Sequence, residues 1–521
     1  MIHPRWVKSP GEVEQNGVAD LPETGKSLHN VAMTSERRIT WAWVAVGASL
    51  ALLIRAPMLG TPITSDEGGY LAIARAWAHG KVLYHDVWID RPQGLLVLFR
   101  VWDWLSGGNT SSLRVMAMLF GVLLVVATAV IVREVAGDRA ARIAAVVCGI
   151  LSATPVLEAH TANGELLSGS VSAAGLAVAV VGLSKDKPLR WLFAAGVLAG
   201  LALSLKQSGF DGLLALFGWL IVVAMCDRAQ RPFALRAMAA TAAGVVTVIA
   251  LLVVHGALTG WSRWWWAVAG YRLQTQSALS GAQWWNLADT ARYGAIAFGG
   301  GVALIALVAA RRLTGARRHL RAMVTSPAAL LPVWLAGAVV SFLIGGGFWR
   351  HYWLLLAAPV SALTGAALSR AGALRIVALA AVVTPCLIIS IWVFAGKSST
   401  LTVRATGDRR SPVDAQVADW FVHHRRRGDN LYALCASSAV YADAHQDPGF
   451  PYLWFPEVYA APHTESTLLA YLGDPRSAPR FIAQYQSPGS CDQSGRLKSI
   501  LTKSYHRVHS IGVATILERN R

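Results

Sequence analysis

The chain has 521 residues, of which 54% are hydrophobic and only 15% charged, and its mean hydropathy is +0.44. A soluble domain usually carries about 25% charged residues, so this composition excludes a soluble globular protein and indicates a polytopic membrane protein. The formal net charge of +18 lies in short clusters between apolar segments, such as Arg311–Arg312 and Arg317–Arg318, with no continuous basic stretch. We therefore expect no nucleic-acid partner.

Residues 1–38 are polar, contain scattered Pro, Gly and Glu, and lack the apolar core of a signal peptide. This composition predicts a disordered cytoplasmic tail. A membrane domain is predicted to follow over residues 39–396, and a second domain over residues 397–521.

Apolar segments of about 20 residues predict roughly eleven transmembrane helices, because that length crosses a bilayer. They cover residues 40–59, 114–132, 141–157, 166–183, 190–205, 209–225, 237–258, 293–310, 328–347, 353–369 and 375–396. The loops after every second helix carry Lys and Arg, for example Arg133 and Arg139, and are therefore predicted to be cytoplasmic. The N-terminus is predicted to be cytoplasmic and, since the number of helices is odd, the C-terminus extracytoplasmic.

Two long segments are predicted on the extracytoplasmic side. In residues 60–113, Tyr70, Ile73 and Trp77 recur at helical spacing. This pattern predicts an amphipathic helix in the membrane interface, or a helix packed on its neighbours. Residues 259–292 are rich in tryptophan, which indicates an interfacial aromatic belt rather than a sugar platform.

The polar residues 397–521 predict a small extracytoplasmic α/β domain. Helices are expected over 414–424 and 496–505, and strands over 430–435, 479–485 and 512–517. Two of the five cysteines, Cys435 and Cys491, fall in this domain. In an oxidising compartment they can form a disulfide, and the sequence leaves both the bridged and the free state open.

Charged side chains inside the apolar scaffold are costly near lipid and usually functional. They comprise Asp66, Glu67, Asp90, Arg91, Glu158, His160, Glu165, Lys206, Arg350 and His351, together with the polar Asn163. By the predicted topology all of them are extracytoplasmic, where Lys and Arg are depleted near helix ends. Arg91, Lys206 and Arg350 therefore indicate an anionic ligand.

Each of these residues also has a structural interpretation. Asp66 and Glu67 could cap a helix that begins near Ser65. Lys206 could extend to the interface, and His351 could belong to the aromatic belt. Asn163 and Glu165 could form an ordinary polar loop. A single anion-binding, acid/base cavity explains all of them together.

Several segments resemble GT-C membrane glycosyltransferases of the protein-mannosyltransferase and lipid A aminoarabinose-transferase type. The specific part is Asp66–Tyr70 (DEGGY) with Tyr84–Gly94 (YHDVWIDRPQG). Weaker matches are Ala162–Glu165 (ANGE), Gly200–Gln207 (GLALSLKQ) and His351–Pro359 (HYWLLLAAP). The resemblance implies an all-α GT-C membrane fold with the small α/β domain outside.

The resemblance implies an inverting transfer of a sugar from a polyprenyl-phosphate donor to an acceptor on the outer face of the membrane. Asp66 falls on the family's general base, and Asp90–Arg91 on an acidic residue followed by a lysine that binds the lipid phosphate. Arginine replaces that lysine here, and Gln93 replaces the family's more usual second proline. A guanidinium group suits a phosphate because it offers a fork of donors.

The chemistry of the residues agrees with this assignment. An acceptor hydroxyl needs a carboxylate to take its proton, and a departing phosphate needs cations, which Arg91, Lys206 and Arg350 can supply. The remaining candidates are assigned to substrate binding: Glu67, Tyr70, Asp90, Asn163, Glu165 and His351. We expect no cofactor beyond the lipid-linked donor; a divalent cation on the carboxylates stays an alternative, although no ligand spacing indicates one.

We expect a multi-pass enzyme of a bacterial cytoplasmic membrane, acting on an envelope glycan, a lipid or a protein. The alternative is a transporter or flippase of an anionic lipid-linked substrate. Charges confined to one side and the lack of visible half-repeats favour the enzyme. A catalytically inactive receptor is a third possibility, which leaves Asp66 and Arg91 unexplained.

Overall fold

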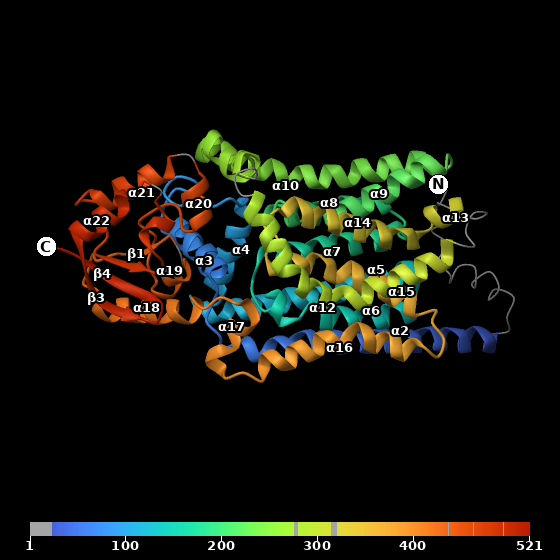
Figure 1. Cartoon of the computed structure of the whole chain (residues 1–521). Coiled ribbons are helices and arrows are strands. Elements are labelled where there is room, and N and C mark those ends of the chain that lie inside the picture. The colour runs from blue at the N-terminus through green and yellow to red at the C-terminus, as the bar shows by residue number, and fades with distance from the viewer. Residues whose placement is uncertain are drawn as a thin grey trace.

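The computed structural model describes residues 23–275, 280–313, 320–435, 437–461, 463–492 and 494–520. It consists of a long helical bundle with a small α/β domain at one end (Figure 1). The first helix, α2 (Glu23–Arg55), begins inside the predicted tail 1–38, and residues 1–22 lie outside the described part. The N-terminal end of α2 lies at the end of the bundle away from the α/β domain.

Nine helical segments of the described residues are long and apolar enough to cross a membrane. They lie in α2, α5 (Leu113–Ala136), α7 (Gly164–Leu183), α8 (Pro188–Leu205), α10 (Arg231–Trp265), α12 (Ser280–Leu313), α14 (Leu330–Gly345), η7 with α15 (Arg350–Leu356 and Ala357–Leu368) and α16 (Arg375–Phe394). The two other predicted spans are shorter helices, α6 (Asp138–Leu151) and α9 (Asp211–Cys226). The predicted fold class, a polytopic helical protein with a small C-terminal α/β domain, is confirmed.

Small residues bring the bundle helices close together, as is usual where lipid removes the hydrophobic drive between helices. Gly47 of α2 faces Gly149 of α6, and Gly196 of α8 faces Gly244 of α10. A methyl group at Gly47 or Gly196 would meet the backbone of the partner helix. These four positions therefore set the spacing of two helix pairs.

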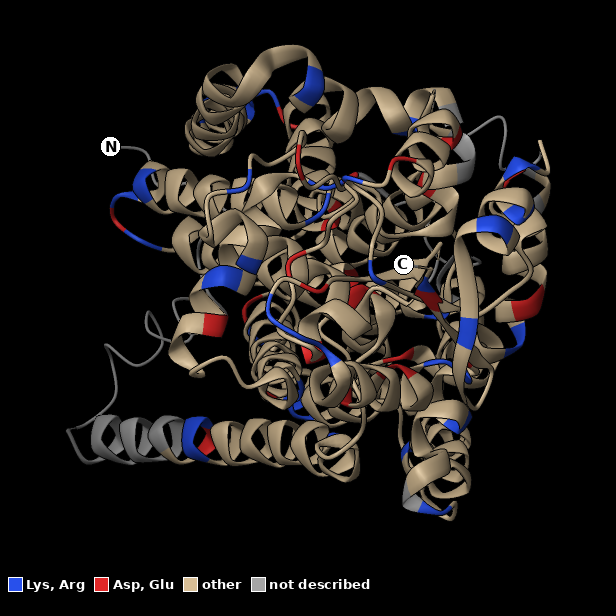
Figure 2. Ribbon diagram, turned by 90° about the vertical axis from the view of Figure 1, so that its left-hand side faces the viewer, with Lys and Arg blue, Asp and Glu red and all other residues tan. Residues whose placement is uncertain are grey.

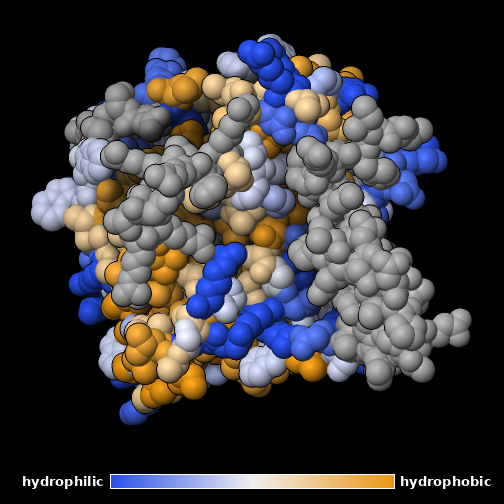
Figure 3. All heavy atoms as spheres, turned by 90° about the vertical axis from the view of Figure 1, so that its right-hand side faces the viewer, coloured by the Kyte–Doolittle hydropathy of each residue, from blue (hydrophilic) through white to orange (hydrophobic). Residues whose placement is uncertain are grey.

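The end of the bundle away from the α/β domain carries the basic loops. The loops after α5, α7, α9 and α15 turn the chain at this end, and hydrophilic residues gather there among apolar ones (Figure 3). Of the basic clusters predicted to be cytoplasmic, Arg317–Arg318 lies outside the described residues.

The first loop, residues 60–113, contains two short helices, α3 (Ser65–Ala78) and α4 (Gln93–Leu105). Of the two interpretations of α3, packing on its neighbours holds, because Tyr70, Ile73 and Ala74 are buried and α3 contacts both α4 and α19 of the α/β domain. The apolar stripe of this loop lies instead on α4, where Val101 and Trp104 are exposed. Helical periodicity shows only that one face of a helix is apolar. It cannot predict whether that face contacts lipid or a second domain.

The tryptophans of 259–292 lie mostly on the surface, since Trp261, Trp265, Trp284 and Trp285 are at least half exposed. This agrees with an interfacial belt. Trp264 differs: it is buried, and its indole N–H donates to Oε1 of Gln93 at 3.0 Å.

The α/β domain contains a four-stranded sheet in the order β1-β2-β4-β3. Its strands are β1 (Leu431–Leu434), β2 (Phe481–Gln484), β3 (Tyr505–Ile511) and β4 (Ala514–Arg519), with β1 and β2 parallel and the other pairs antiparallel. The helices are α17 (Leu401–Thr406), α18 (Ser411–His424), α19 (Ala439–Asp443), α20 (Phe455–Ala460), α21 (Thr464–Gly473) and α22 (Arg496–Ser504). Three strands were predicted; β3 was missed because it follows α22 directly, without a turn residue between them.

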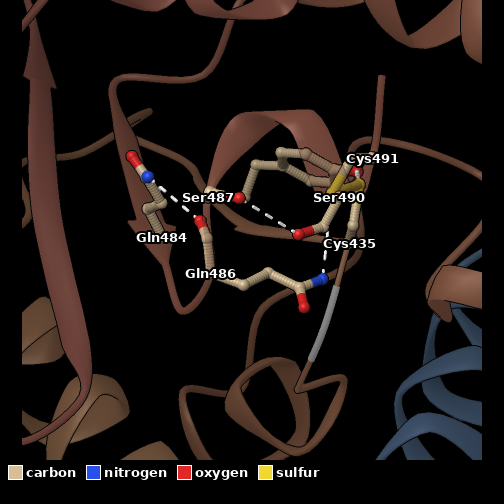
Figure 4. Close-up of a disulfide and its surroundings, with 7 residues drawn as sticks. Cys435, Gln484, Gln486, Ser487, Ser490 and Cys491 are labelled. Atoms are coloured by element: carbon tan, nitrogen blue, oxygen red, sulfur yellow. Dashed lines mark hydrogen bonds between the residues drawn. A yellow bond between two sulfur atoms is a disulfide. The ribbon is translucent and has the colours of Figure 1, made fainter. Parts of the chain in front are cut away.

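A disulfide joins Cys435, at the end of β1, to Cys491, which lies 56 residues further along the chain (Figure 4). Gln486 directs its amide nitrogen at Sγ of Cys491, at 4.0 Å. The bridge therefore ties the two halves of the domain together beside the turn that contacts α3.

The domain docks on α3 through the two glycines of the DEGGY motif. A Cβ at Gly68 would collide with Ala439 and one at Gly69 with the ring of Trp454. Beside them, Oγ of Ser438 donates to the carbonyl oxygen of Ser65 at 2.6 Å. Glycine is therefore required at both positions for the domain to reach the first turn of α3.

Candidate active site

Glu67 is a structural residue. Its carboxylate accepts hydrogen bonds from the backbone and side chain of Thr64, the N-cap of α3, at 3.0 and 2.9 Å. It also pairs with Arg114 at 2.5 Å and accepts from the amide of Ala162 at 2.8 Å, with no side-chain exposure. Every side of this carboxylate is occupied, so the assignment of Glu67 to substrate binding is not supported by its environment.

Asp66, in the same turn, is half-buried and has no hydrogen bond or ion pair with any residue that the structure describes. Thr64 and Glu67 provide the cap of α3, so Asp66 does not act as one. Burial raises the pKa of Asp66, while the positive charges of His351 and Arg91 partly offset that rise. Its carboxylate is therefore a free acceptor beside a positive region.

Asp90 lies between two arginines. Nη1 of Arg91 donates to it, and Nη2 of Arg272, from α11 (Tyr271–Thr275), lies 2.6 Å from Oδ2. Burial alone would raise the pKa of Asp90, but Arg272 and Arg91 outweigh it, so the pKa is lowered. Gln207 holds the loop that carries Asp90 and Arg91. Its side chain donates to the carbonyl oxygens of Asp90 at 2.8 Å and of Val268 at 3.0 Å.

Arg91 keeps unused donor capacity. Its side chain is 10% exposed, Nη1 donates to Asp90, and Nε has no partner among the described residues. One carboxylate is thus shared by two guanidinium groups, which leaves a net positive charge. Such a site can bind an anion in a forked geometry.

A second charged network also acts on Asp66. Lys206 pairs with Glu165, both of them buried, and His351 contacts Glu158 through Nδ1 at 2.6 Å and Glu165 through Nε2 at 3.6 Å. The ammonium group of Lys206 also lies 4.0 Å from the ring centre of Tyr352. Glu165 occupies the charge of Lys206, so the cations at Asp90 remain: Arg91, whose Nε has no partner among the described residues, and Arg272, whose Nη1 donates to the carbonyl oxygen of Gly345 at 3.1 Å.

Three other predicted residues, Tyr70, Asn163 and Arg350, lie outside these two charged networks. Tyr70 is buried with its ring against Phe99 and Trp454, at 5.5 and 5.9 Å between ring centres. Burial raises the pKa of its hydroxyl; the charge of Asp66 adds to the rise and that of Arg91 opposes it. Asn163 is the N-cap of α7, accepting from the amide of Leu166 at 2.8 Å.

Arg350 does not join the cluster. It donates to the carbonyl oxygen of Ala405 in α17 at 3.2 Å, and its guanidinium group lies 4.2 Å from the ring centre of Tyr293. The resemblance places it near the site in sequence, but its side chain reaches toward the linker into the α/β domain.

Sequence reasoning missed Arg272, Arg114 and Glu457. Arg272 follows a run of tryptophans that indicated only an aromatic belt. An arginine on the predicted outer side goes against the positive-inside bias, and this could have marked Arg272 as a candidate site residue. Arg114 begins a predicted span, and Glu457 lies in α20 of the α/β domain, where a single carboxylate carries no signal.

The site lies where the bundle meets the α/β domain. Viewed from the domain end, acidic and basic segments are interleaved in the middle of the molecule, while the long helices show few charges (Figure 2). Within the described ranges no group of three or more His, Cys, Asp or Glu side chains is arranged to hold a metal ion.

The helical bundle with this charged site at one end shares its fold with solved GT-C membrane glycosyltransferases. Residues 90–256 match the family model described as dolichyl-phosphate-mannose-protein mannosyltransferase. No curated protein sequence matches the chain significantly. The resemblance predicted from the sequence motifs is confirmed.

Solved structures support the same fold. ArnT from Cupriavidus metallidurans bound to undecaprenyl phosphate is similar with a TM-score of 0.60 and 15% identity, over 91% of this chain and 98% of ArnT. Its apo state gives a TM-score of 0.59 at 15% identity, over 91% and 97%. The oligosaccharyltransferase AglB from Archaeoglobus fulgidus, in complex with an inhibitory peptide and a dolichol-phosphate, gives 0.54 at 14% identity, over 86% and 69%.

Proposed function

We propose that the protein is a glycosyltransferase that moves a sugar from a polyprenyl-phosphate donor to an acceptor hydroxyl, with inversion. One observation carries the proposal: a carboxylate without a partner, Asp66, lies beside an arginine pair that one carboxylate does not saturate. ArnT and AglB, which share the fold, are seen with a polyprenyl phosphate. The family match points to the same class of donor.

Asp66 acts as the general base. It takes the proton of the acceptor hydroxyl, which then attacks the anomeric carbon from the side opposite the phosphate. Burial raises the pKa of Asp66, which strengthens it as a base, and the flanking positive charges keep it ionisable.

Arg91 and Arg272 hold the donor phosphate and stabilise the negative charge that develops on it as the sugar leaves. Asp90 keeps the two guanidinium groups in place while the site is empty. Glu165 pairs with Lys206 and lies beside His351, so we assign both residues to positioning Lys206.

We propose that the reaction takes place on the extracytoplasmic side of a bacterial cytoplasmic membrane, with an envelope glycan, lipid or protein as acceptor. The basic loops lie at the opposite end of the bundle, which the positive-inside bias puts in the cytoplasm. An impermeant reagent should reach a tag after Arg521 in intact cells and should not reach one before Met1. The reverse labelling would move the reaction to the cytoplasmic side.

Mass spectrometry of the purified protein tests the donor directly. A co-purified polyprenyl phosphate, with or without a sugar, is the expected result, and added undecaprenyl phosphate should bind saturably. A protein that neither carries nor binds such a lipid would contradict the proposal. Saturable binding combined with passage of the intact lipid across a vesicle membrane would favour a flippase instead.

A further inference from the structure

Glu457 is a buried carboxyl group that the proposed chemistry does not use. It lies in α20 of the α/β domain and is 5% exposed, and its Oε2 has no hydrogen-bond partner among the described residues. An unsatisfied buried carboxyl oxygen costs free energy, so its presence calls for an explanation. The position of Glu457 relative to the anion site offers one.

The segment that carries Glu457 packs over the loop that carries Arg91. The amide of Trp88 donates to the carbonyl oxygen of Pro451 at 3.0 Å, and the rings of Trp88 and Tyr452 lie 5.2 Å apart between centres. Burial raises the pKa of Glu457 well above its usual range; the charge of Asp90 adds to the rise and that of Arg91 opposes it. Glu457 therefore belongs to the segment of the α/β domain that packs on the loop with the anion site, within the electrostatic influence of Asp90 and Arg91.

Trp454 lies one turn earlier and presents a second unused group. Its indole N–H is buried without a partner in the described part of the chain, and its ring lies over Gly69 and 5.9 Å from the ring centre of Tyr70. A hydrogen-bond donor and an acceptor thus lie close together in the chain, both buried, on the side of the domain that covers α3. Packing alone would favour apolar side chains at these positions.

We propose that Trp454 and Glu457 bind the sugar ring of the lipid-linked donor, with Oε2 of Glu457 accepting a hydrogen bond from a ring hydroxyl or amino group. This inference rests on the proposed function, because it assumes that Arg91 and Arg272 hold the donor phosphate. It makes the α/β domain a part of the active site.

The chemistry favours the sugar over the phosphate as the partner of Glu457. Arg91 and Arg272 already offer the phosphate charged donors, so the phosphate gains little from a further carboxyl group, which would be repelled by it whenever ionised. A sugar supplies hydroxyl donors for Glu457 and acceptor oxygens for the indole of Trp454. Its apolar ring face can lie against Tyr70 and Trp454.

The test compares lipids with and without a sugar. Binding of undecaprenyl phosphate, undecaprenyl-phosphate mannose and undecaprenyl-phosphate glucosamine is measured on the full-length wild type, Glu457→Gln and Trp454→Phe. The matched control is Asp419→Asn, which changes a carboxylate of the same domain whose side chain is 75% exposed. Thermal melting of each variant separates lost binding from lost folding.

In the wild type, at least one sugar-bearing lipid should bind more tightly than undecaprenyl phosphate. Glu457→Gln should weaken binding of that lipid by up to ~10-fold, as for losing a hydrogen bond between neutral groups, and leave binding of undecaprenyl phosphate unchanged. Trp454→Phe should give a smaller loss of the same kind, and Asp419→Asn none. A larger loss with the glucosamine lipid would identify an amino group as the donor, and a larger loss with the mannose lipid a hydroxyl.

Two results would overturn the inference: a wild type that does not prefer any sugar-bearing lipid, or a Glu457→Gln variant that keeps the full preference. Failure of the proposed function looks different, because the wild type would then bind none of the three lipids.

Discussion

Asp66 and Glu67 are neighbouring carboxylates in one turn of α3, and the structure gives them opposite environments. Glu67 is fully enclosed by Arg114, Thr64 and the amide of Ala162. Asp66 has no partner within the described part of the chain. A carboxylate whose lone pairs are all occupied can hold a fold together, but only one with free lone pairs can take a proton.

The two arginines that accompany them differ in the same way. Arg114 donates to Glu67 and, through Nη2, to the carbonyl oxygen of Pro62 at 2.6 Å. Arg91 uses Nη1 alone and shares its carboxylate with Arg272. The first pair stabilises the entry of α3, whereas the second remains free to exchange its partner for a ligand.

Removing the enclosed carboxylate should have the largest effect on stability. Glu67→Gln leaves the buried Arg114 without its counter-ion, which should destabilise the protein by about 3–5 kcal/mol. Thermal or denaturant unfolding in detergent measures this loss. Asp66→Asn is the matched control and should change stability by less than about 0.5 kcal/mol; equal losses in both variants would abolish the distinction between the two sites.

Asp66→Asn should affect catalysis instead. Turnover should fall by at least ~100-fold, because the amide keeps the size of the side chain and loses the basic lone pair. Binding of undecaprenyl phosphate should persist. Near-normal turnover in Asp66→Asn would show that another group takes the proton.

The open arginine pair should control affinity for the phosphate. Arg91→Ala should weaken undecaprenyl phosphate binding by roughly 1.5–3 kcal/mol, and Arg91→Lys should restore part of it, since the charge returns without the fork. Arg272→Ala should cost less, because its side chain is 34% exposed. Arg350→Ala is the control, since Arg350 contacts Ala405 and not the cluster; a loss there matching that in Arg91→Ala would relocate the phosphate site.

The pH profile should show the smallest effect. Activity requires ionised Asp66, so kcat/KM should rise with pH through the pKa of this group. Because burial raises that pKa, the acidic limb should lie at higher pH than for an ordinary aspartate. Arg91 lowers the pKa of Asp66, so Arg91→Ala should move the limb further up; an unchanged limb would mean that the two groups do not interact.

The sequence predicted the membrane spans and the strands β1, β2 and β4, because hydropathy and motif spacing are local properties; the roles of Asp66 and Arg91 stay predictions. It assigned Glu67 to substrate binding because Arg114 and Ala162, which enclose this carboxylate, lie far from it in the sequence. The same limit explains Arg272, whose partner lies in another segment of the chain. Long-range pairing decides which charges stay free.

Docking through Gly68 and Gly69 has a consequence for how the protein is made. Asp66 and Arg91 lie early in the chain, whereas the α/β domain that docks on α3 follows the helices of the bundle. In the proposed topology this domain crosses the membrane before it folds, so the proposed active site is completed only after the helices have inserted. We expect a chain truncated before this domain to insert its helices and to be inactive.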